Sequence, residues 1–328
     1  MRKYFLLICL FILGCESQYR TAGKVYIQQE EYDKAAEQFN LQLKQTPNDP
    51  DAWWWLGMAY TYQKKYEDAC QCMDKVAEIA PEKQELKKQI PFLWSLYYSA
   101  GISAYQEKSW ELAKNRFTQA TRLEPDSFQT YMNLGLVYVC LEQEDTAIVY
   151  YKKVIELDTN NIDAYRNLGI YYMKKKEYDE AQKYFNKVLG LKPKDADILY
   201  RIGIAYYLKE DYPNAEASFK RAIECDSTLE DAYFNLGATL VKQNKYDESI
   251  EVLKKTIEIK PNDVEALLHL GGTYLLTKKY DAAIEIYTKI IQLDPAKREA
   301  YEGRANAYWK LGKKAEAEAD LRIVKEMK

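Results

Sequence analysis

Histidine is nearly absent, because the 328 residues contain only one. This excludes histidine-rich metal sites and argues against acid–base catalysis by histidine. A large excess of one charge sign is missing as well, since the chain has 47 Lys and Arg residues and 50 Asp and Glu residues. A chain so balanced carries no electrostatic signature of nucleic-acid binding. The chain also lacks a Gly-x-Ser-x-Gly elbow, a phosphate-binding glycine loop and a His-Glu-x-x-His motif. We therefore expect no enzymatic activity, no catalytic residues, no cofactor, no metal and no nucleic-acid partner.

No apolar run near the start of the chain is long enough to cross a membrane. The run from Tyr4 to Leu13 has ten residues, whereas a membrane span needs about twenty. A short apolar run after a basic start (Arg2, Lys3) is typical of a secretory signal. The run ends in Ile-Leu-Gly-Cys at residues 12–15, which resembles the lipobox of bacterial lipoproteins.

The lipobox resemblance implies that residues 1–14 are removed and that Cys15 becomes the acylated N-terminus. Two or more acyl chains on one residue give stable anchoring, whereas a single chain gives only marginal binding. The expected location is therefore the bacterial cell envelope, with the protein lipid-anchored and facing the periplasm or the exterior. The alternative is an ordinary cleaved signal followed by an incidental cysteine.

Glycine is scarce, at 13 residues, yet most of it recurs with a fixed period. Successive glycines stand 34 residues apart, except for one step of 44, and we number this place position 8 of a 34-residue repeat. Small residues recur at position 20 and large apolar ones at position 24. Position 8 holds Gly23, Gly57, Gly101, Gly135, Gly169, Gly203, Gly237, Gly271 and Ala305. Position 20 holds Ala35, Ala69, Ala113, Ala147, Ala181, Ala215, Ser249, Ala283 and Ala317. Position 24 holds Phe39, Met73, Phe117, Tyr151, Phe185, Phe219, Leu253, Tyr287 and Leu321.

Apolar residues within one repeat lie at positions 4, 7, 8 and 11 and again at 17, 20, 24 and 27, which predicts two helices. Trp53, Leu56, Gly57 and Tyr60 match the first part of the tetratricopeptide signature. The chain thus resembles the tetratricopeptide repeat family. This resemblance implies an all-α fold: an α-solenoid of helix-turn-helix repeats that forms a right-handed superhelix, with about nine repeats over residues 16–328.

Two places depart from the repeat. Ten extra residues fall within 81–91, where we expect one or two additional helical turns and a following helix that opens at Pro91. The second helix of the last repeat, Lys314 to Lys328, is highly charged, so the last repeat is expected to act as the polar cap of the array. We interpret Gly271-Gly272 as a pair that packs helices together.

The apolar positions 4, 7, 8 and 11 of each first helix form what we call the packing stripe. Positions 2, 5, 6, 9, 12 and 13 point away from it, and we call the surface that they form the groove face. In the tetratricopeptide family the corresponding face lines a concave groove that holds ligands. Here it is unusually apolar, which is typical of a binding surface, although neighbouring repeats could instead shield it. Its apolar candidates are Trp54, Trp55, Tyr98, Tyr105, Tyr200, Tyr207 and Phe234.

Polar side chains recur at position 6 of the groove face. An asparagine side chain offers both a donor and an acceptor, so it can pair with a peptide backbone of any sequence. Regular asparagines are similar to those in the repeat region of O-linked N-acetylglucosamine transferase, where they hold peptide backbone. The polar candidates are Asn133, Asn167, Arg201, Asn235 and His269.

Acidic residues also recur at position 2, as in Asp51 and Asp197, and we assign them to helix N-termini, where negative charge is favoured. The sequence therefore predicts a non-enzymatic interaction scaffold or adaptor that binds proteins or peptide segments in its groove. Cell-envelope or pilus assembly would suit such an adaptor. The alternative is a substrate-recognition or accessory subunit of an enzyme complex, and the oligomeric state stays open.

Overall fold

The computed structural model describes residues 17–327, and every regular element in that range is an α-helix. The expected signal at residues 1–14 and the expected lipidation site Cys15 lie outside the described residues. The helices are α2 (Gln18–Gln28), α3 (Tyr32–Gln45), α4 (Pro50–Tyr62), α5 (Tyr66–Ile79), α6 (Gln84–Lys88), α7 (Ile90–Gln106), α8 (Trp110–Leu123), α9 (Phe128–Cys140), α10 (Glu144–Leu157), α11 (Ile162–Lys174), α12 (Tyr178–Leu191), α13 (Ala196–Leu208), α14 (Tyr212–Cys225), α15 (Glu230–Lys242), α16 (Tyr246–Ile259), α17 (Val264–Leu276), α18 (Tyr280–Leu293), α19 (Arg298–Lys310) and α20 (Lys314–Glu326).

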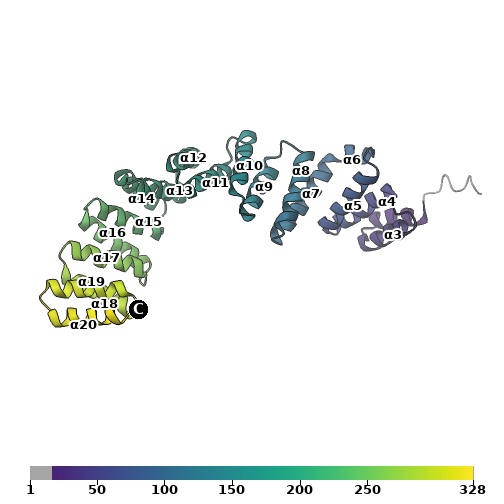
Figure 1. The fold of residues 1–328 in the computed structure, drawn as a ribbon. Helices are drawn as coiled ribbons and strands as arrows, with labels where there is room; N and C mark the ends of the chain where they lie inside the picture. Colours follow the sequence, from purple (N-terminus) through teal and green to yellow (C-terminus); the bar gives the residue numbers. More distant parts are fainter. Residues whose placement is uncertain (1–16, 328) are drawn as a thin grey trace, which may run out of the picture. The chain divides into compact units, whose positions relative to one another are not determined.

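The chain divides into two compact units at Thr159 and Asn160. Helices α2–α10 belong to the first unit and α11–α20 to the second (Figure 1). Within each unit, consecutive helices pair into hairpins, and each hairpin packs on the next one along the chain. The predicted all-α solenoid of helix-turn-helix repeats is therefore confirmed.

The closest contact of the hairpin joins position 8 to position 24. A Cβ atom added to Gly203 would lie 2.5 Å from the ring of Phe219, and one added to Gly101 would lie 2.6 Å from the ring of Phe117. Real Cβ atoms essentially never come this close to another heavy atom. Both rings are fully buried. The glycine period thus marks the places where a large side chain, a ring in most repeats and Met73 or Leu253 in two, lies directly on the backbone of the neighbouring helix.

Every hairpin turns at position 15 through a residue with positive φ. The amide that follows bonds back to position 11, as Glu177 N does to the carbonyl oxygen of Tyr172 at 2.9 Å, which satisfies an end carbonyl of the first helix. Only the last turn uses glycine, the residue that adopts this conformation without steric cost. The nine turn residues are Glu30, Lys64, Lys108, Glu142, Lys176, Glu210, Asn244, Lys278 and Gly312.

Many of the first helices begin with a side-chain cap. Asp195 accepts a hydrogen bond from the amide of Ile198 at 3.2 Å, and Asp263 accepts one from Ala266 at 2.9 Å. Such caps satisfy amides that have no partner inside the helix. The position-2 acids follow in the first turn, as Asp197 does in α13, so their assignment to helix N-termini is confirmed.

The inserted residues form the short helix α6 and lengthen α7 at its start. Helix α7 has 17 residues, against 13 in α9, and it carries Pro91 in its first turn. The packing of α5 on α7 is the least extensive of the junctions between successive hairpins inside either unit.

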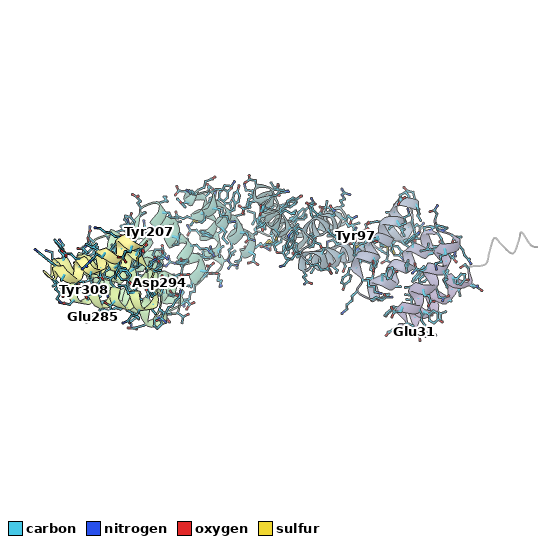
Figure 2. The ribbon with its side chains drawn as sticks, turned by 60° about the horizontal axis from the view of Figure 1, so that its bottom comes forward. Glu31, Tyr97, Tyr207, Glu285, Asp294 and Tyr308 are labelled. Carbon is cyan, nitrogen blue, oxygen red and sulfur yellow. The ribbon has the colours of Figure 1, made fainter. Side chains whose placement is uncertain are left out.

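A buried arginine links α8 to α5 next to that junction. Arg116 donates to Glu67 at 2.8 Å and to Asp74 at 2.7 Å, and it lies over the ring of Tyr97. Tyr97, which is labelled in Figure 2, in turn donates its hydroxyl to Asp74 at 2.7 Å. A buried guanidinium with two carboxylates is held by charge-assisted hydrogen bonds, so this cluster clamps two successive hairpins together.

The last hairpin is held differently from the others. Arg304 of α19 forms a bidentate pair with Asp320 of α20, at 2.9 and 2.8 Å, and Asp320 is buried. Leu321, at position 24, is 42% exposed, whereas its equivalents in the earlier repeats are buried. The outer surface of α20 is therefore not wholly polar, and its role as a cap stays a prediction.

A second charged clamp joins α14 to the turn between α15 and α16. Glu216 accepts hydrogen bonds from Lys220 at 2.6 Å, Lys245 at 2.7 Å and Gln243 at 2.8 Å. Burial alone would raise the pKa of Glu216, but these three donors outweigh it and lower the pKa to about 2.

The contact of the glycine backbone with the ring predicts opposite effects of one methyl group at two glycines. Gly203→Ala should destabilise the protein by about 1–3 kcal/mol, because the new Cβ overlaps the Phe219 ring. Gly190→Ala is the matched control, since a Cβ there meets nothing within 4 Å, and it should stabilise helix α12 by about 0.5–1 kcal/mol. Urea unfolding measures both changes. Equal effects at the two glycines would refute the assigned contact.

The clamp at Glu216 predicts a pH dependence of stability. The folded pKa lies below the unfolded value, so the carboxylate stabilises the protein above about pH 4.5, and this contribution disappears as the pH falls towards 2. Glu216→Gln should therefore cost about 1–3 kcal/mol at pH 7, and its thermal midpoint should approach that of the wild type near pH 2. Glu251→Gln, which changes a 73% exposed carboxylate, is the control and should leave the midpoint unchanged at every pH. A difference between Glu216→Gln and wild type that does not depend on pH would contradict the assignment.

Candidate functional site

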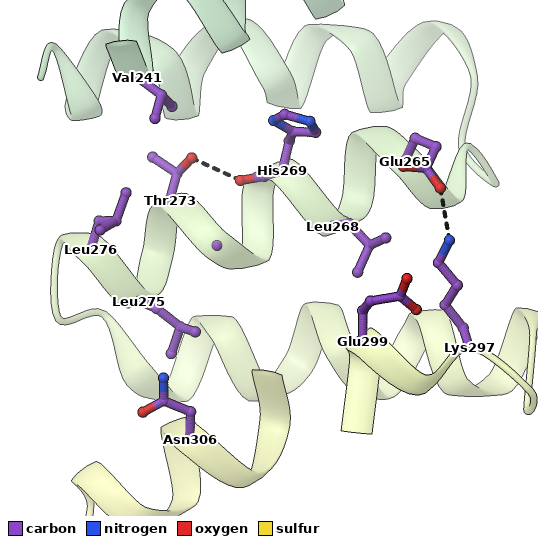
Figure 3. Close-up of a pocket in the computed structure, with 11 residues that line it drawn as sticks. Val241, Glu265, Leu268, His269, Thr273, Leu275, Leu276, Lys297, Glu299 and Asn306 are labelled. Atoms are coloured by element: carbon purple, nitrogen blue, oxygen red, sulfur yellow. Dashed lines mark hydrogen bonds and ion pairs between the residues drawn. The ribbon is translucent and has the colours of Figure 1, made fainter. Parts of the chain in front are cut away.

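The groove face of the second unit has a hollow of about 720 Å³ that is open to solvent and lies between α15, α17 and α19 (Figure 3). All but two of its lining residues stand at positions 2, 5, 6, 9, 12 and 13 of the first helices. We call this space the C-terminal hollow, and it is lined by Val241, Glu265, Leu268, His269, Gly272, Thr273, Leu275, Leu276, Lys297, Glu299 and Asn306. A volume of this order is typical of ligand sites in proteins.

Contacts between neighbouring first helices follow a constant offset along the groove face. Position 5 of one repeat touches position 6 of the next. Asn133 donates to the hydroxyl of Tyr98 at 3.0 Å in the first unit, and Asn235 donates to the hydroxyl of Tyr200 at 3.2 Å in the second. Predicted aromatic and polar candidates are thus brought together in pairs, which we call the Tyr–Asn pairs.

The orientation of both asparagines is fixed by a second hydrogen bond. Each side-chain nitrogen also donates to the carbonyl oxygen four residues earlier, that of Gln129 at 3.0 Å and that of Asp231 at 2.8 Å. A backbone carbonyl only accepts, so the amide nitrogen must face it, and the amide oxygen remains unused. The tyrosine hydroxyl accepts from asparagine and keeps its own hydrogen. Each Tyr–Asn pair therefore presents one acceptor and one donor side by side.

The remaining polar candidates do not form such pairs. Arg201 donates to Asp197 of its own helix at 2.9 Å. Asn167 is half-buried, and its side chain makes no hydrogen bond with any described residue. His269 packs edge-to-face on Phe234, with ring centroids 4.9 Å apart, at the same offset as the Tyr–Asn pairs. Desolvation lowers the pKa of His269, while Glu265 acts in the opposite direction, so the ring is neutral at pH 7.

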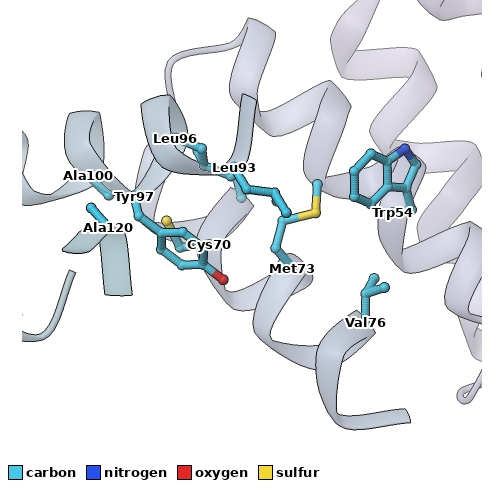
Figure 4. Close-up of a cluster of buried hydrophobic side chains, with 10 residues drawn as sticks. Trp54, Cys70, Met73, Val76, Leu93, Leu96, Tyr97, Ala100 and Ala120 are labelled. Atoms are coloured by element: carbon cyan, nitrogen blue, oxygen red, sulfur yellow. The ribbon is translucent and has the colours of Figure 1, made fainter. Parts of the chain in front are cut away.

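The prediction of Trp54 as an exposed anchor is wrong. Its side chain is 6% exposed and lies in a core cluster with Met73 and Leu93 (Figure 4). The ring of Phe92 lies 6.1 Å from the indole, centroid to centroid. The physical reason is the early start of α7, since Phe92 and Leu93 lie in residues 90–93, which precede position 1 of the third repeat, and both belong to the cluster around the indole. Trp54 therefore belongs to the packing of two repeats.

The other aromatic candidates keep part of their surface accessible and are held in place by neighbouring rings. Trp55 is half-buried, with Lys24 over its ring at 5.4 Å. Tyr98 stacks on Trp94 at 5.2 Å, and Tyr105 packs edge-on to Trp110 at 5.2 Å. Tyr207 is fixed in the same way by an edge contact with Tyr212 at 5.7 Å.

The C-terminal hollow lies on the predicted groove face, but of its lining residues only His269 was named as a candidate. Gly272 does not pack helices together, because a Cβ there would meet nothing within 4 Å, whereas Gly271 contacts Tyr287 as expected. A sequence signal for the hollow existed at position 9, where large residues give way to small ones. Position 9 reads Met58, Ile102, Leu136, Ile170, Ile204, Ala238 and Gly272 from the second repeat to the eighth.

Two searches of residues 17–327 bear on other kinds of site. No three His, Cys, Asp or Glu side chains of these residues gather where they could hold a metal ion. None of the described helices combines the length and the apolar composition needed to cross a bilayer.

Comparisons with known proteins were made on sequence and on structure. BBSome complex member BBS4 of Mus musculus is 23% identical over 146 residues, which are 44% of this chain and 25% of that protein. This chain therefore spans only a quarter of the length of that relative. The crystal structure of YrrB, described as a TPR protein with an unusual peptide-binding site, has 26% identity and a TM-score of 0.52, over 57% of this chain and 97% of that one.

The structure of pilF from Pseudomonas aeruginosa aligns with 18% identity and a TM-score of 0.53, over 66% of this chain and 98% of that one. At this identity the likeness shows a common fold alone.

Tetratricopeptide repeat patterns match most of the chain. They match residues 23–63, 50–83, 128–161, 166–230, 218–251, 237–278, 264–297 and 299–327. Together with the hairpins and their glycine–ring contacts, these matches show that the chain belongs to the tetratricopeptide repeat family.

Proposed function

We propose that the protein is a non-enzymatic interaction scaffold that binds peptide segments of partner proteins on its groove face. The observation that carries this proposal is the C-terminal hollow, which groove-face positions of three successive first helices line. Packing does not fill this space, and its lining combines apolar side chains with a few polar ones, as binding sites commonly do.

The Tyr–Asn pairs give the proposal a chemical mechanism. A peptide unit carries one N–H donor and one C=O acceptor. The free asparagine oxygen and the tyrosine hydroxyl hydrogen of one pair complement these two groups. Because both belong to the backbone of the ligand, the pairs would hold an extended segment without regard to its sequence. The likeness to YrrB, which is described as having a peptide-binding site, supports this use of the fold.

The proposed place of action is the bacterial cell envelope. The lipobox at residues 12–15 supports an anchor made by acyl chains on Cys15. An anchored scaffold of this kind would gather partners at the membrane outside the cytoplasm, for instance during the assembly of pili or other envelope structures.

Removal of the tyrosine hydroxyls tests the binding mechanism. Peptides selected from a random library on the purified protein serve as probes. Tyr98 and Tyr200 belong to different units, so a peptide bound in either unit loses one hydrogen bond in the double variant Tyr98→Phe with Tyr200→Phe. Such peptides should bind it up to about fivefold more weakly, because one hydrogen bond contributes about 1 kcal/mol or less at an exposed site. Fluorescence anisotropy measures the affinity, and circular dichroism checks that helicity is retained. Tyr246→Phe is the control, since that hydroxyl donates to Asn244 beyond the groove face.

Unchanged affinity of the double variant, or an equal loss in Tyr246→Phe, would show that the Tyr–Asn pairs do not bind the backbone. Failure to select any peptide would overturn the proposed function as a whole.

Replacement of the lipobox cysteine tests the anchor. Cys15→Ser removes the sulfur that receives the acyl chain, so the variant should incorporate no labelled fatty acid and should leave the membrane fraction or remain unprocessed. Cys225→Ser, which changes an exposed free thiol in the repeat array, should behave as the wild type does. Equal labelling of the Cys15→Ser protein and the wild type would disprove lipidation at this residue.

A further inference from the structure

We propose that the C-terminal hollow is a specificity pocket that receives one large apolar side chain of a bound peptide, with a lysine or arginine next to it. This inference rests on the proposed function and adds the chemistry of the segment that is recognised. It follows from the empty space over Gly272, from the apolar floor of the hollow and from the charges at its edge.

The space over Gly272 is the first step. Position 9 lies on the groove face, and in repeats four to six it carries leucine or isoleucine, as at Leu136 and Ile204. At Gly272 a Cβ would meet nothing within 4 Å. Because glycine has no side chain, this space in the groove is left open, and no neighbouring group occupies it. A ligand side chain can occupy the volume that leucine or isoleucine fills in other repeats.

The floor around Gly272 is apolar. Val241, Leu268, Leu275 and Leu276 line it, and Leu276 is 53% exposed although it is a large aliphatic residue. Water over such a surface is displaced favourably by another apolar group. A volume of about 720 Å³ accommodates a large side chain together with the backbone that carries it.

The charges at the edge of the hollow select the neighbouring residue. Three charged side chains line it: Glu265, Lys297 and Glu299. Lys297 forms an ion pair with Glu265 at 2.8 Å. Glu299 acts on Lys297 only through space and forms no ion pair with any described residue. His269 is neutral at pH 7, so the lining has a net charge of −1. A ligand lysine or arginine next to the apolar residue would complement Glu299.

Peptide selection tests both parts of the pocket. A random peptide library is selected on four purified proteins: the wild type, Gly272→Leu, Glu299→Lys and the control Gly190→Leu. The two glycine variants are matched, because both glycines are helical and neither has an atom within 4 Å of an added Cβ. The wild type and Gly190→Leu should enrich peptides in which a large apolar residue stands next to lysine or arginine.

Gly272→Leu fills the hollow, so peptides of this kind should bind it about tenfold or more weakly than the wild type, as expected for the loss of one buried apolar side chain. Glu299→Lys should keep the apolar preference and replace the basic neighbour by Asp or Glu. Thermal midpoints confirm that each variant is folded, and Gly272→Leu introduces a residue that Leu136 already places at the same position of the fourth repeat.

Other outcomes overturn the inference and locate the error. If selected peptides bind wild type and Gly272→Leu equally but lose affinity in the Tyr98→Phe and Tyr200→Phe protein, the proposed function stands and the specificity pocket does not. If selection yields no peptide, both fail. If the wild type self-associates in sedimentation and Gly272→Leu abolishes this, a second copy of the chain occupies the hollow and the inference is wrong.

Discussion

The contact between the backbone of a first helix and a buried side chain at position 24, which is an aromatic ring in six of the nine repeats, sets the geometry of the hairpins. It requires glycine at position 8 of the first eight repeats, because a Cβ there would overlap the side chain at position 24. The packing stripe of the first helix is thereby directed at the second helix of its own hairpin. The opposite side of the first helix is left to face its neighbours and solvent, so the groove face is a by-product of this contact. In the last repeat Ala305 replaces the glycine, and a buried Arg304–Asp320 pair joins the two helices there.

The fold could be predicted from sequence because the contact that defines it repeats. The site could be predicted only in part, because it depends on what differs between repeats. Trp54 shares position 5 with Tyr98, yet only Trp54 is buried, since the insertion extends α7 over it. The pattern of an average repeat contains no information on a neighbour of unusual length. The hollow at Gly272 depends likewise on a single residue, and a glycine in a helix has no property that distinguishes packing from empty space until the surrounding atoms are known.

The charged clamps show that the contacts between successive hairpins differ from one junction to the next. Arg116 with Glu67 and Asp74 supports the junction that has the least extensive helix packing, and Glu216 with Lys245 joins two later hairpins. Neither cluster has a counterpart at the same positions in every repeat. Contacts inside a hairpin are therefore uniform, while contacts between hairpins vary along the chain. Because a repeat array is stabilised by its nearest neighbours, these junctions determine where it opens first.

The constant offset of the Tyr–Asn pairs bears on the spacing of the peptide that we propose as the ligand. Neighbouring packed helices lie about 8–10 Å apart, and an extended peptide advances about 3.3 Å per residue. A peptide that moves from one first helix to the next within a unit must therefore advance by about three residues. Within one unit, successive first helices would therefore contact ligand residues about three apart, and the residue over Gly272 would be one of them.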